Sequence, residues 1–117
     1  MAFDPMSDLT LRLRQFAAER DWEQFHSPKN LAISLSVEAG EVLEHFQWLN
    51  NEDSQTLPRE TRDQIALELA DVLLYLLRLA DRLEVNLLES AYQKLTLNGA
   101  KYPVSLARGR STKYTDL

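Results

Sequence analysis

The segment from Ile65 to Ala80 would be aliphatic around most of a helix, and this constrains the fold more than any other part of the chain. Only four of its sixteen residues are not aliphatic: Glu68, Asp71, Tyr75 and Arg78. At about 100° per residue, their spacing of i, i+3, i+7 and i+10 places them within about 80° of one another on a helix. A helix that is apolar elsewhere is expected to be buried. Its carboxylates then need a cation, a proton or a polar cleft, because an unpaired buried carboxylate is costly.

A second acidic stripe with the same spacing lies earlier in the chain, at Glu38, Glu41, His45 and Trp48. If the two helices pack side by side, their axes lie about 8–10 Å apart. The four carboxylates of Glu38, Glu41, Glu68 and Asp71 would then meet across one seam. Like charges that close together repel unless something neutralises them. Carboxylate oxygens suit a hard cation, so the pattern favours a site for Mg²⁺, with Mn²⁺ as the alternative.

Two other interpretations of the stripes stay open at this point. Acidic residues three apart are common on solvated helix faces, so Glu38 and Glu41 could be surface residues. The stripe on Ile65–Ala80 could also be the only exposed strip of its helix, with Arg78 as an internal counter-charge. The shared spacing of two acidic stripes favours the metal site over both.

The rest of the chain predicts an all-α fold, with helices over about 7–20, 27–49, 58–83 and 87–98. Ser7 is the expected N-cap of the first helix, and Ser27 with Pro28 begins the second. Residues 50–57 are expected to form a loop and 104–117 a tail without helix. The length of 117 residues predicts one domain, over residues 7–117. Residues 1–6 are expected to be a flexible N-terminus, or residues ahead of a natural start at Met6.

Composition and charge exclude several classes of protein. The formal net charge of −5 argues against a general binder of nucleic acid polymers. The absence of cysteine excludes disulfides and thiolate metal sites. The longest apolar run is shorter than the ~18 residues that a membrane-spanning helix needs, and no signal peptide is recognisable. We therefore expect a soluble cytoplasmic protein with no membrane partner.

Two further groups of residues are candidates for binding a ligand. Lys94, Asn98 and Lys101 share a helix face and could hold phosphate oxygens, although a solvated basic edge near a helix C-terminus is the more common arrangement. Aromatic side chains could stack on a nucleobase, although most tryptophans pack in cores or interfaces. The candidates here are Trp22, Phe25, His26, Trp48 and Tyr75.

The sequence resembles that of a known family. Glu38-x-x-Glu41, followed after 26 residues by Glu68-x-x-Asp71, is similar to the signature of the MazG-like all-α nucleoside triphosphate pyrophosphohydrolases. Further segments resemble the dCTP pyrophosphatase branch of that family. These are Phe16–His26, Phe46–Trp48, Asp71–Tyr75, Asn98 with Lys101–Pro103, and Lys113–Leu117.

The resemblance implies a four-helix MazG-like bundle assembled through helix–helix contacts between subunits. It implies a homo-oligomer, a tetramer first and a dimer as the fallback. It also implies hydrolysis of a (deoxy)nucleoside triphosphate, dCTP or a related dNTP, to the monophosphate and pyrophosphate with Mg²⁺. The alternative is a non-catalytic module that binds nucleotides or mediates helical oligomerisation.

The resemblance also assigns roles to residues. Glu38, Glu41, Glu68 and Asp71 would hold the metal, and Glu38 or Glu41 would serve as the catalytic base. The substrate would be bound by Trp22, His26, Trp48, Tyr75, Lys94, Asn98, Lys101 and Tyr102. One departure from the family pattern concerns recognition of the nucleobase. The dCTP-specific relatives carry a His where this chain has Leu13. Cytosine preference is therefore left open.

Overall fold

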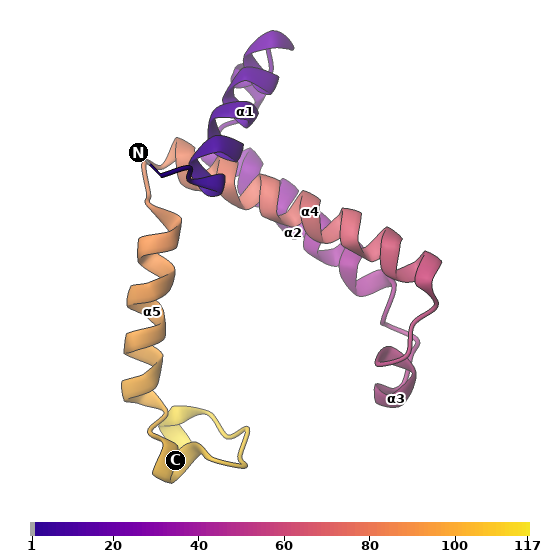
Figure 1. Ribbon diagram of the computed structural model, residues 1–117, viewed down its shortest axis with the longest axis vertical. Helices are drawn as coiled ribbons and strands as arrows, with labels where there is room; N and C mark the ends of the chain where they lie inside the picture. Colours follow the sequence, from indigo (N-terminus) through magenta and orange to yellow (C-terminus); the bar gives the residue numbers. More distant parts are fainter. Residues whose placement is uncertain (1) are drawn as a thin grey trace. The chain divides into compact units, whose positions relative to one another are not determined.

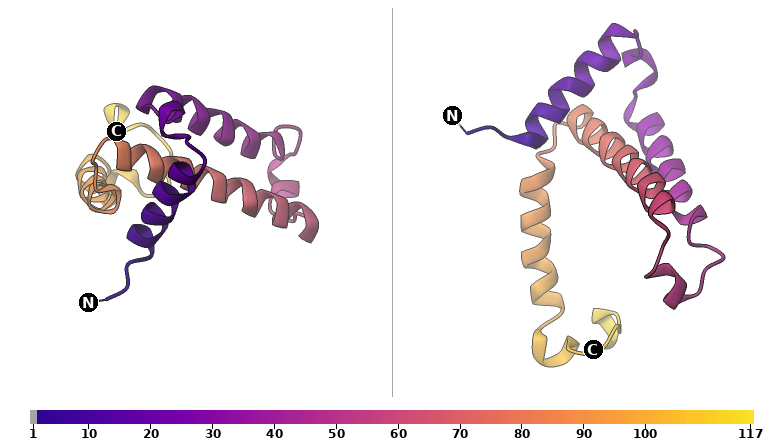
Figure 2. Two further views of the ribbon diagram at one scale, coloured as in Figure 1. Left: turned by 90° about the horizontal axis from the view of Figure 1, so that it is seen from above. Right: turned by 45° about the vertical axis from the view of Figure 1, so that its right-hand side comes forward.

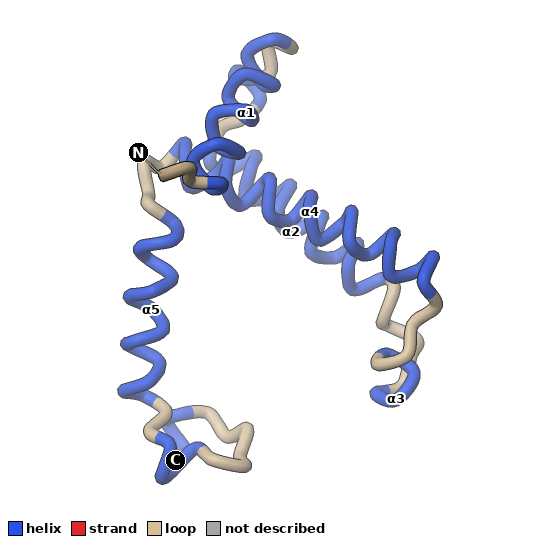
Figure 3. Tube along the Cα trace, in the orientation of Figure 1, coloured by secondary structure: helices blue, strands red, loops and turns tan. Residues whose placement is uncertain are grey.

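The structure is a computed structural model that describes residues 2–117. It divides the chain into two compact units, Met1–Glu84 and Val85–Leu117, which are described separately. The regular structure of residues 2–117 is helical throughout (Figure 3), which confirms the predicted all-α class. The single domain expected over residues 7–117 stays a prediction.

The first unit is built on two long helices that lie side by side. Its elements are α1 (Pro5–Glu19), η1 (Glu23–Phe25), α2 (Pro28–Glu44), α3 (Asn51–Ser54) and α4 (Arg59–Arg82). Helices α2 and α4 pack along each other, and α1 packs against α4 (Figures 1 and 2). As predicted, α2 starts at Pro28, with the Ser27 hydroxyl accepting a hydrogen bond from the Asn30 N–H at 3.2 Å.

Two helix ends and one loop of the first unit differ from the sequence expectation. Helix α1 starts at Pro5, because the Asp4 carboxylate, not Ser7, accepts the capping hydrogen bond from the Met6 N–H. Helix α2 ends at Glu44, so Trp48 lies beyond it and does not continue its acidic stripe. The expected loop after α2 contains the short helix α3, where the Asn50 side chain caps the Asp53 N–H at 2.8 Å.

The core of the first unit is small and, apart from Ile65, gathers around the C-terminal half of α4. The buried apolar residues are Ala17, Leu31, Ile65, Leu77 and Ala80. In the N-terminal half of the same helix, Leu67 is 72% and Leu69 is 53% exposed. The expectation of a buried helix from Ile65 to Ala80 is therefore wrong, within one chain, for its N-terminal half, because no other described element covers that surface.

The second unit contains α5 (Leu87–Lys101), α6 (Val104–Ala107) and η2 (Tyr114–Asp116). The Asn86 side chain caps α5 by accepting from the Glu89 N–H at 3.0 Å. The helix continues through Gly99 to Lys101, past the expected end at Asn98, and α6 adds a helical turn to the predicted helix-free tail. No side chain of residues 85–117 is buried. No helix in residues 2–117 is both long and apolar enough to cross a membrane.

Candidate active site

The packing of α2 against α4 brings the four motif carboxylates to one seam, as the matched stripes predicted. Glu38 and Glu41 come from α2, and Glu68 and Asp71 come from α4. Glu38, Glu41 and Glu68 are half-buried, whereas Asp71 is exposed. All four groups are close enough for the charges of the other three to act on Glu38. Three acids are thus neither solvated surface residues nor part of the hydrophobic core.

Glu38 lies at the centre of this seam. Desolvation raises the pKa of Glu38, and the neighbouring Glu41 carboxyl raises it further, followed by the charges of Asp71 and Glu68. Its Oε2 atom is shielded from solvent and has no hydrogen-bond partner among the described residues. A buried carboxylate oxygen without a donor is rare in folded proteins. The seam therefore keeps an acceptor ready for a cation or a proton.

His45, at the C-cap of α2, connects the two helices at this seam. Its Nε2 atom lies 2.6 Å from Oε2 of Glu68. The distance is that of an ion pair, but the contact lacks hydrogen-bond geometry, because the same Glu68 oxygen has no hydrogen-bond partner. His45 has no predicted role from the sequence. Its position four residues after Glu41 on the acidic stripe was the signal for this contact.

The donor set suits a hard cation, although the ligands are not fully assembled. Within residues 2–117, no three Asp, Glu or His side chains already form a group that could hold a metal ion. The orphaned Oε2 of Glu38 and the all-carboxylate composition nevertheless fit Mg²⁺. Coordination would therefore require these side chains to rearrange. The metal-ligand roles stay predictions.

Arg78 does not serve as the counter-charge of the acidic stripe, which removes one alternative left open by the sequence. Only 5% of Arg78 is exposed. Its Nη1 donates to Oδ2 of Asp81 at 3.3 Å, and its Nε donates to Nδ1 of His26 at 3.2 Å. Asp81 in turn accepts two hydrogen bonds from Arg14 of α1. The motif carboxylates are therefore left without an arginine partner in the described residues.

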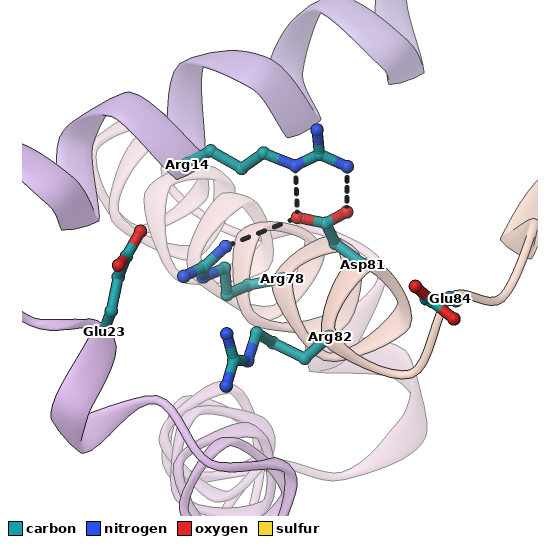
Figure 4. Close-up of a pocket in the computed structure, with 6 residues that line it drawn as sticks. All are labelled: Arg14, Glu23, Arg78, Asp81, Arg82 and Glu84. Carbon is teal, nitrogen blue, oxygen red and sulfur yellow. Dashed lines mark hydrogen bonds and ion pairs between the residues drawn. The ribbon is translucent and has the colours of Figure 1, made fainter.

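These arginines line an open pocket of about 280 Å³ between α1, η1 and the end of α4. Figure 4 shows Arg14 and Arg78 reaching the Asp81 carboxylate from two sides, with Arg82 and Glu23 alongside. Neither Arg14 nor Asp81 is among the residues predicted from the sequence. They lie 67 residues apart, so neither helical spacing nor a local motif could have paired them.

The aromatic candidates are not all in one place. Trp22 is 43% exposed, and its ring lies edge-on to His26, with centroids 6.2 Å apart. Tyr75 is half-buried on α4, four residues beyond Asp71. Trp48 is 86% exposed, beyond the end of α2. The structure thus pairs Trp22 with His26 but leaves Trp48 free of packing within its own chain.

The remaining candidates, Lys94, Asn98, Lys101 and Tyr102, belong to the second unit. Within that unit, the Tyr102 and Tyr114 rings meet edge-on at 5.9 Å, and the Lys101 ammonium lies 4.8 Å from the Tyr114 ring centroid. A cation over an aromatic face is held by the ring's quadrupole. Lys94 is exposed and Asn98 is half-buried on α5. Their role toward phosphate stays a prediction.

Comparison with known proteins places this arrangement in a family. A model of the MazG-like family matches residues 33–117, which include all four carboxylates of the seam. The chain belongs to the MazG-like family. Among its MazG-like relatives, mouse dCTP pyrophosphatase 1 is 45% identical over 114 residues, covering 96% of this chain and 67% of the mouse protein. Human dCTP pyrophosphatase 1 is 44% identical, with the same coverage.

A solved structure agrees with this assignment. A pyrophosphatase from Archaeoglobus fulgidus superposes with a TM-score of 0.79 at 39% sequence identity, covering 88% of this chain and 96% of that one. Fold and sequence therefore point to the same MazG-like family and, within it, to similarity with the dCTP pyrophosphatase branch, as the sequence predicted.

Proposed function

We propose that this chain is a Mg²⁺-dependent nucleoside triphosphate pyrophosphohydrolase that converts dCTP or a related dNTP to the monophosphate and pyrophosphate. The observation that carries the proposal is the convergence of Glu38, Glu41, Glu68 and Asp71 on the α2–α4 seam, with one Glu38 oxygen shielded and unpartnered. The activity that gives the similar mouse and human enzymes their name, dCTP pyrophosphatase, supports the same reaction.

The seam's own groups supply binding and proton transfer. The four carboxylates would hold Mg²⁺, or Mn²⁺ in its place, and the bound ion would neutralise charge on the phosphate oxygens. Glu38 or Glu41 would orient a water molecule and accept its proton as the water attacks the α-phosphorus in line. The bond from the α-phosphorus to the bridging oxygen breaks, and pyrophosphate leaves.

The nucleoside would be held by aromatic side chains and the phosphates by polar side chains of residues 94–102. Trp22, Trp48, Tyr75 and His26 are proposed to frame the base and sugar, since stacking tolerates different bases. The phosphate ligands are proposed to be Lys94, Asn98, Lys101 and Tyr102. Because Leu13 cannot hydrogen-bond a base, we propose that selectivity for cytosine is relaxed. We place the reaction in the cytoplasm, with no nucleic acid polymer as substrate.

The working enzyme is proposed to be a homo-oligomer, a tetramer first and a dimer as the fallback. The exposed leucines on the N-terminal half of α4 have counterparts on α2, where Ile33, Val37 and Leu43 are 53%, 55% and 60% exposed. Large exposed apolar surfaces mark interfaces, and closed symmetry is their usual cover. A second copy of the chain would bury this surface close to the acidic seam.

The proposal is tested by measuring pyrophosphate and monophosphate release from a panel of NTPs and dNTPs, with and without Mg²⁺. In ¹⁸O-labelled water, attack on the α-phosphorus places the label in the monophosphate, whereas attack on the β-phosphorus places it in pyrophosphate. Glu41→Gln and Asp71→Asn should each abolish turnover with unchanged helicity. Glu44→Gln, exposed on the same helix as Glu41, is the matched control and should retain activity. Near-native turnover by either motif variant at saturating Mg²⁺ would contradict the proposal.

A further inference from the structure

Arg78 is the one charged residue buried among residues 2–117, and its contacts determine the chemistry of His26. A guanidinium carries only donors and does not lose its proton in proteins. Its Nε–H, 3.2 Å from Nδ1 of His26, therefore requires that Nδ1 be an unprotonated acceptor. A neutral imidazole with a bare Nδ1 carries its proton on Nε2. The contact thus selects one tautomer of His26.

The groups around this pair hold it in place. Arg78 is fixed on its other side by Asp81, which Arg14 of α1 clamps through two hydrogen bonds. The segment that carries His26 is tied to the start of α2, because the Asn30 side chain donates to the Phe25 carbonyl at 3.1 Å. Desolvation, with the positive charges of Arg78 and Arg82, lowers the pKa of His26 and favours the neutral ring. Glu23 also lines this pocket and is the acidic group nearest in sequence to His26.

The free side of the His26 ring is available to a ligand. Its Nε2 makes no hydrogen bond to another described residue, yet it is not among the solvent-shielded atoms that lack a partner. The ring lies beside the 43% exposed Trp22, whose indole is edge-on to it at 6.2 Å. A directed Nε2–H donor therefore stands next to an aromatic surface suited to stacking.

We propose that Arg78 is a positioning residue that fixes His26 as a neutral Nε2–H donor for a carbonyl oxygen or ring nitrogen of a base stacked near Trp22. A neutral donor suits a neutral acceptor, whereas a phosphate would be better served by a protonated imidazole. The tautomer of His26 follows from the Arg78–His26 contact. The identity of the ligand as a nucleobase rests on the proposed function. The two parts can be measured separately.

Nitrogen NMR of the imidazole rings in the full chain tests the tautomer without any turnover. The chain has two histidines, so His26→Phe identifies the His26 signals by their loss. At a pH where the ring is neutral, the wild type should show a protonated Nε2 and a bare Nδ1. Arg78→Met, which keeps the length of the side chain but removes its donors, should give a mixture of tautomers. A proton on Nδ1, or a mixture in the wild type, overturns the proposal.

Kinetics with the best dNTP test the role of the donor. His26→Phe should raise KM about tenfold, the equivalent of one hydrogen bond. Arg78→Met should raise KM less, by about twofold, because a ring divided between two tautomers still presents the donor part of the time. In both variants kcat should stay within about twofold. The double variant should be no worse than His26→Phe alone, because both changes remove the same interaction. His26→Gln, which retains an N–H donor, should recover part of the loss. An unchanged KM in Arg78→Met with folded protein overturns the proposal.

Arg14→Met separates this role from a purely structural one. It removes the clamp on Asp81 but leaves the Arg78–His26 contact, so it should lower stability with KM unchanged. An equal rise of KM in Arg14→Met would show that the network only supports packing. If the wild type releases no pyrophosphate from any nucleotide with Mg²⁺, the proposed function fails and the nucleotide assignment falls with it, while the NMR result still decides the tautomer.

Discussion

The ion pair between Arg14 and Asp81 joins α1 to α4, and its two partners should differ sharply in their importance for stability. The Asp81 side chain is 10% exposed and also contacts Arg78, whose side chain is 6% exposed. The Arg14 side chain is 55% exposed. Asp81→Asn therefore leaves a buried guanidinium without its counter-charge, whereas Arg14→Met leaves Asp81 paired with Arg78 (Figure 4).

The expected magnitudes follow from these environments. Removing one partner of a buried ion pair costs about 3 kcal/mol or more, because the remaining charge cannot return to water. Breaking a pair whose arginine is half-exposed costs much less, because water screens the charge. With a urea m-value of about 1.5 kcal/mol/M, Asp81→Asn should lower the unfolding midpoint by about 2 M, and Arg14→Met should lower it by much less. Both midpoints can be measured by following the loss of helicity in urea with circular dichroism. All variants must be compared at one protein concentration, because assembly shifts apparent stability.

The pH dependence provides an independent check on Asp81. Hydrogen bonding to Arg14 lowers the pKa of Asp81 below its ordinary 3.8, and desolvation opposes this only in part. A carboxyl with a lowered folded pKa contributes stability above its unfolded pKa and loses it as the pH falls through the folded value. The wild type should therefore lose more free energy of unfolding than Asp81→Asn when acidified below about pH 4. Arg12→Met, an exposed change on α1 on the face opposite Arg14, is the control. Equal destabilisation by Asp81→Asn and Arg14→Met would refute this reasoning.

Three further predictions concern specificity, assembly and the acidic seam. The wild type should hydrolyse dCTP and at least one other dNTP, whereas Leu13→His should restrict hydrolysis more strongly to dCTP. Strict selectivity of the wild type for dCTP would contradict this. Leu67→Asp, a surface change in the single chain, should shift the mass measured by light scattering toward the 13.5 kDa monomer, and an unchanged mass would exclude α4 from the interface. Glu38→Gln should raise the free energy of unfolding in EDTA by about 0.5 kcal/mol, since it removes like-charge repulsion, and a lower free energy would count against the repulsive seam.

The helices and the acidic seam could be predicted because they depend on local patterns. The start of α2 follows from Ser27 and Pro28, and the seam follows from two stripes with one spacing. The end of α2 at Glu44 could not be predicted, because the apolar pattern continues past it to Leu49. The network of Arg14, Asp81 and Arg78 was also beyond reach, because its members come together only when α1 docks on α4.

Helix α4 thus carries two polar clusters that obey opposite rules. At Asp81, a carboxylate meets the donors of two arginines, so removing its charge should destabilise the fold. At Asp71, as at Glu38 and Glu41 on the other side of the seam, carboxylates face other carboxylates and an oxygen of Glu38 is left unpartnered, so removing a charge there should stabilise it. A fold that tolerates such repulsion gains nothing from it in stability. The cluster of Arg14, Asp81 and Arg78 at the end of the same helix shows that the fold can pair its buried charges. The unpaired carboxylates of the seam are therefore best explained by a cation that binds between them.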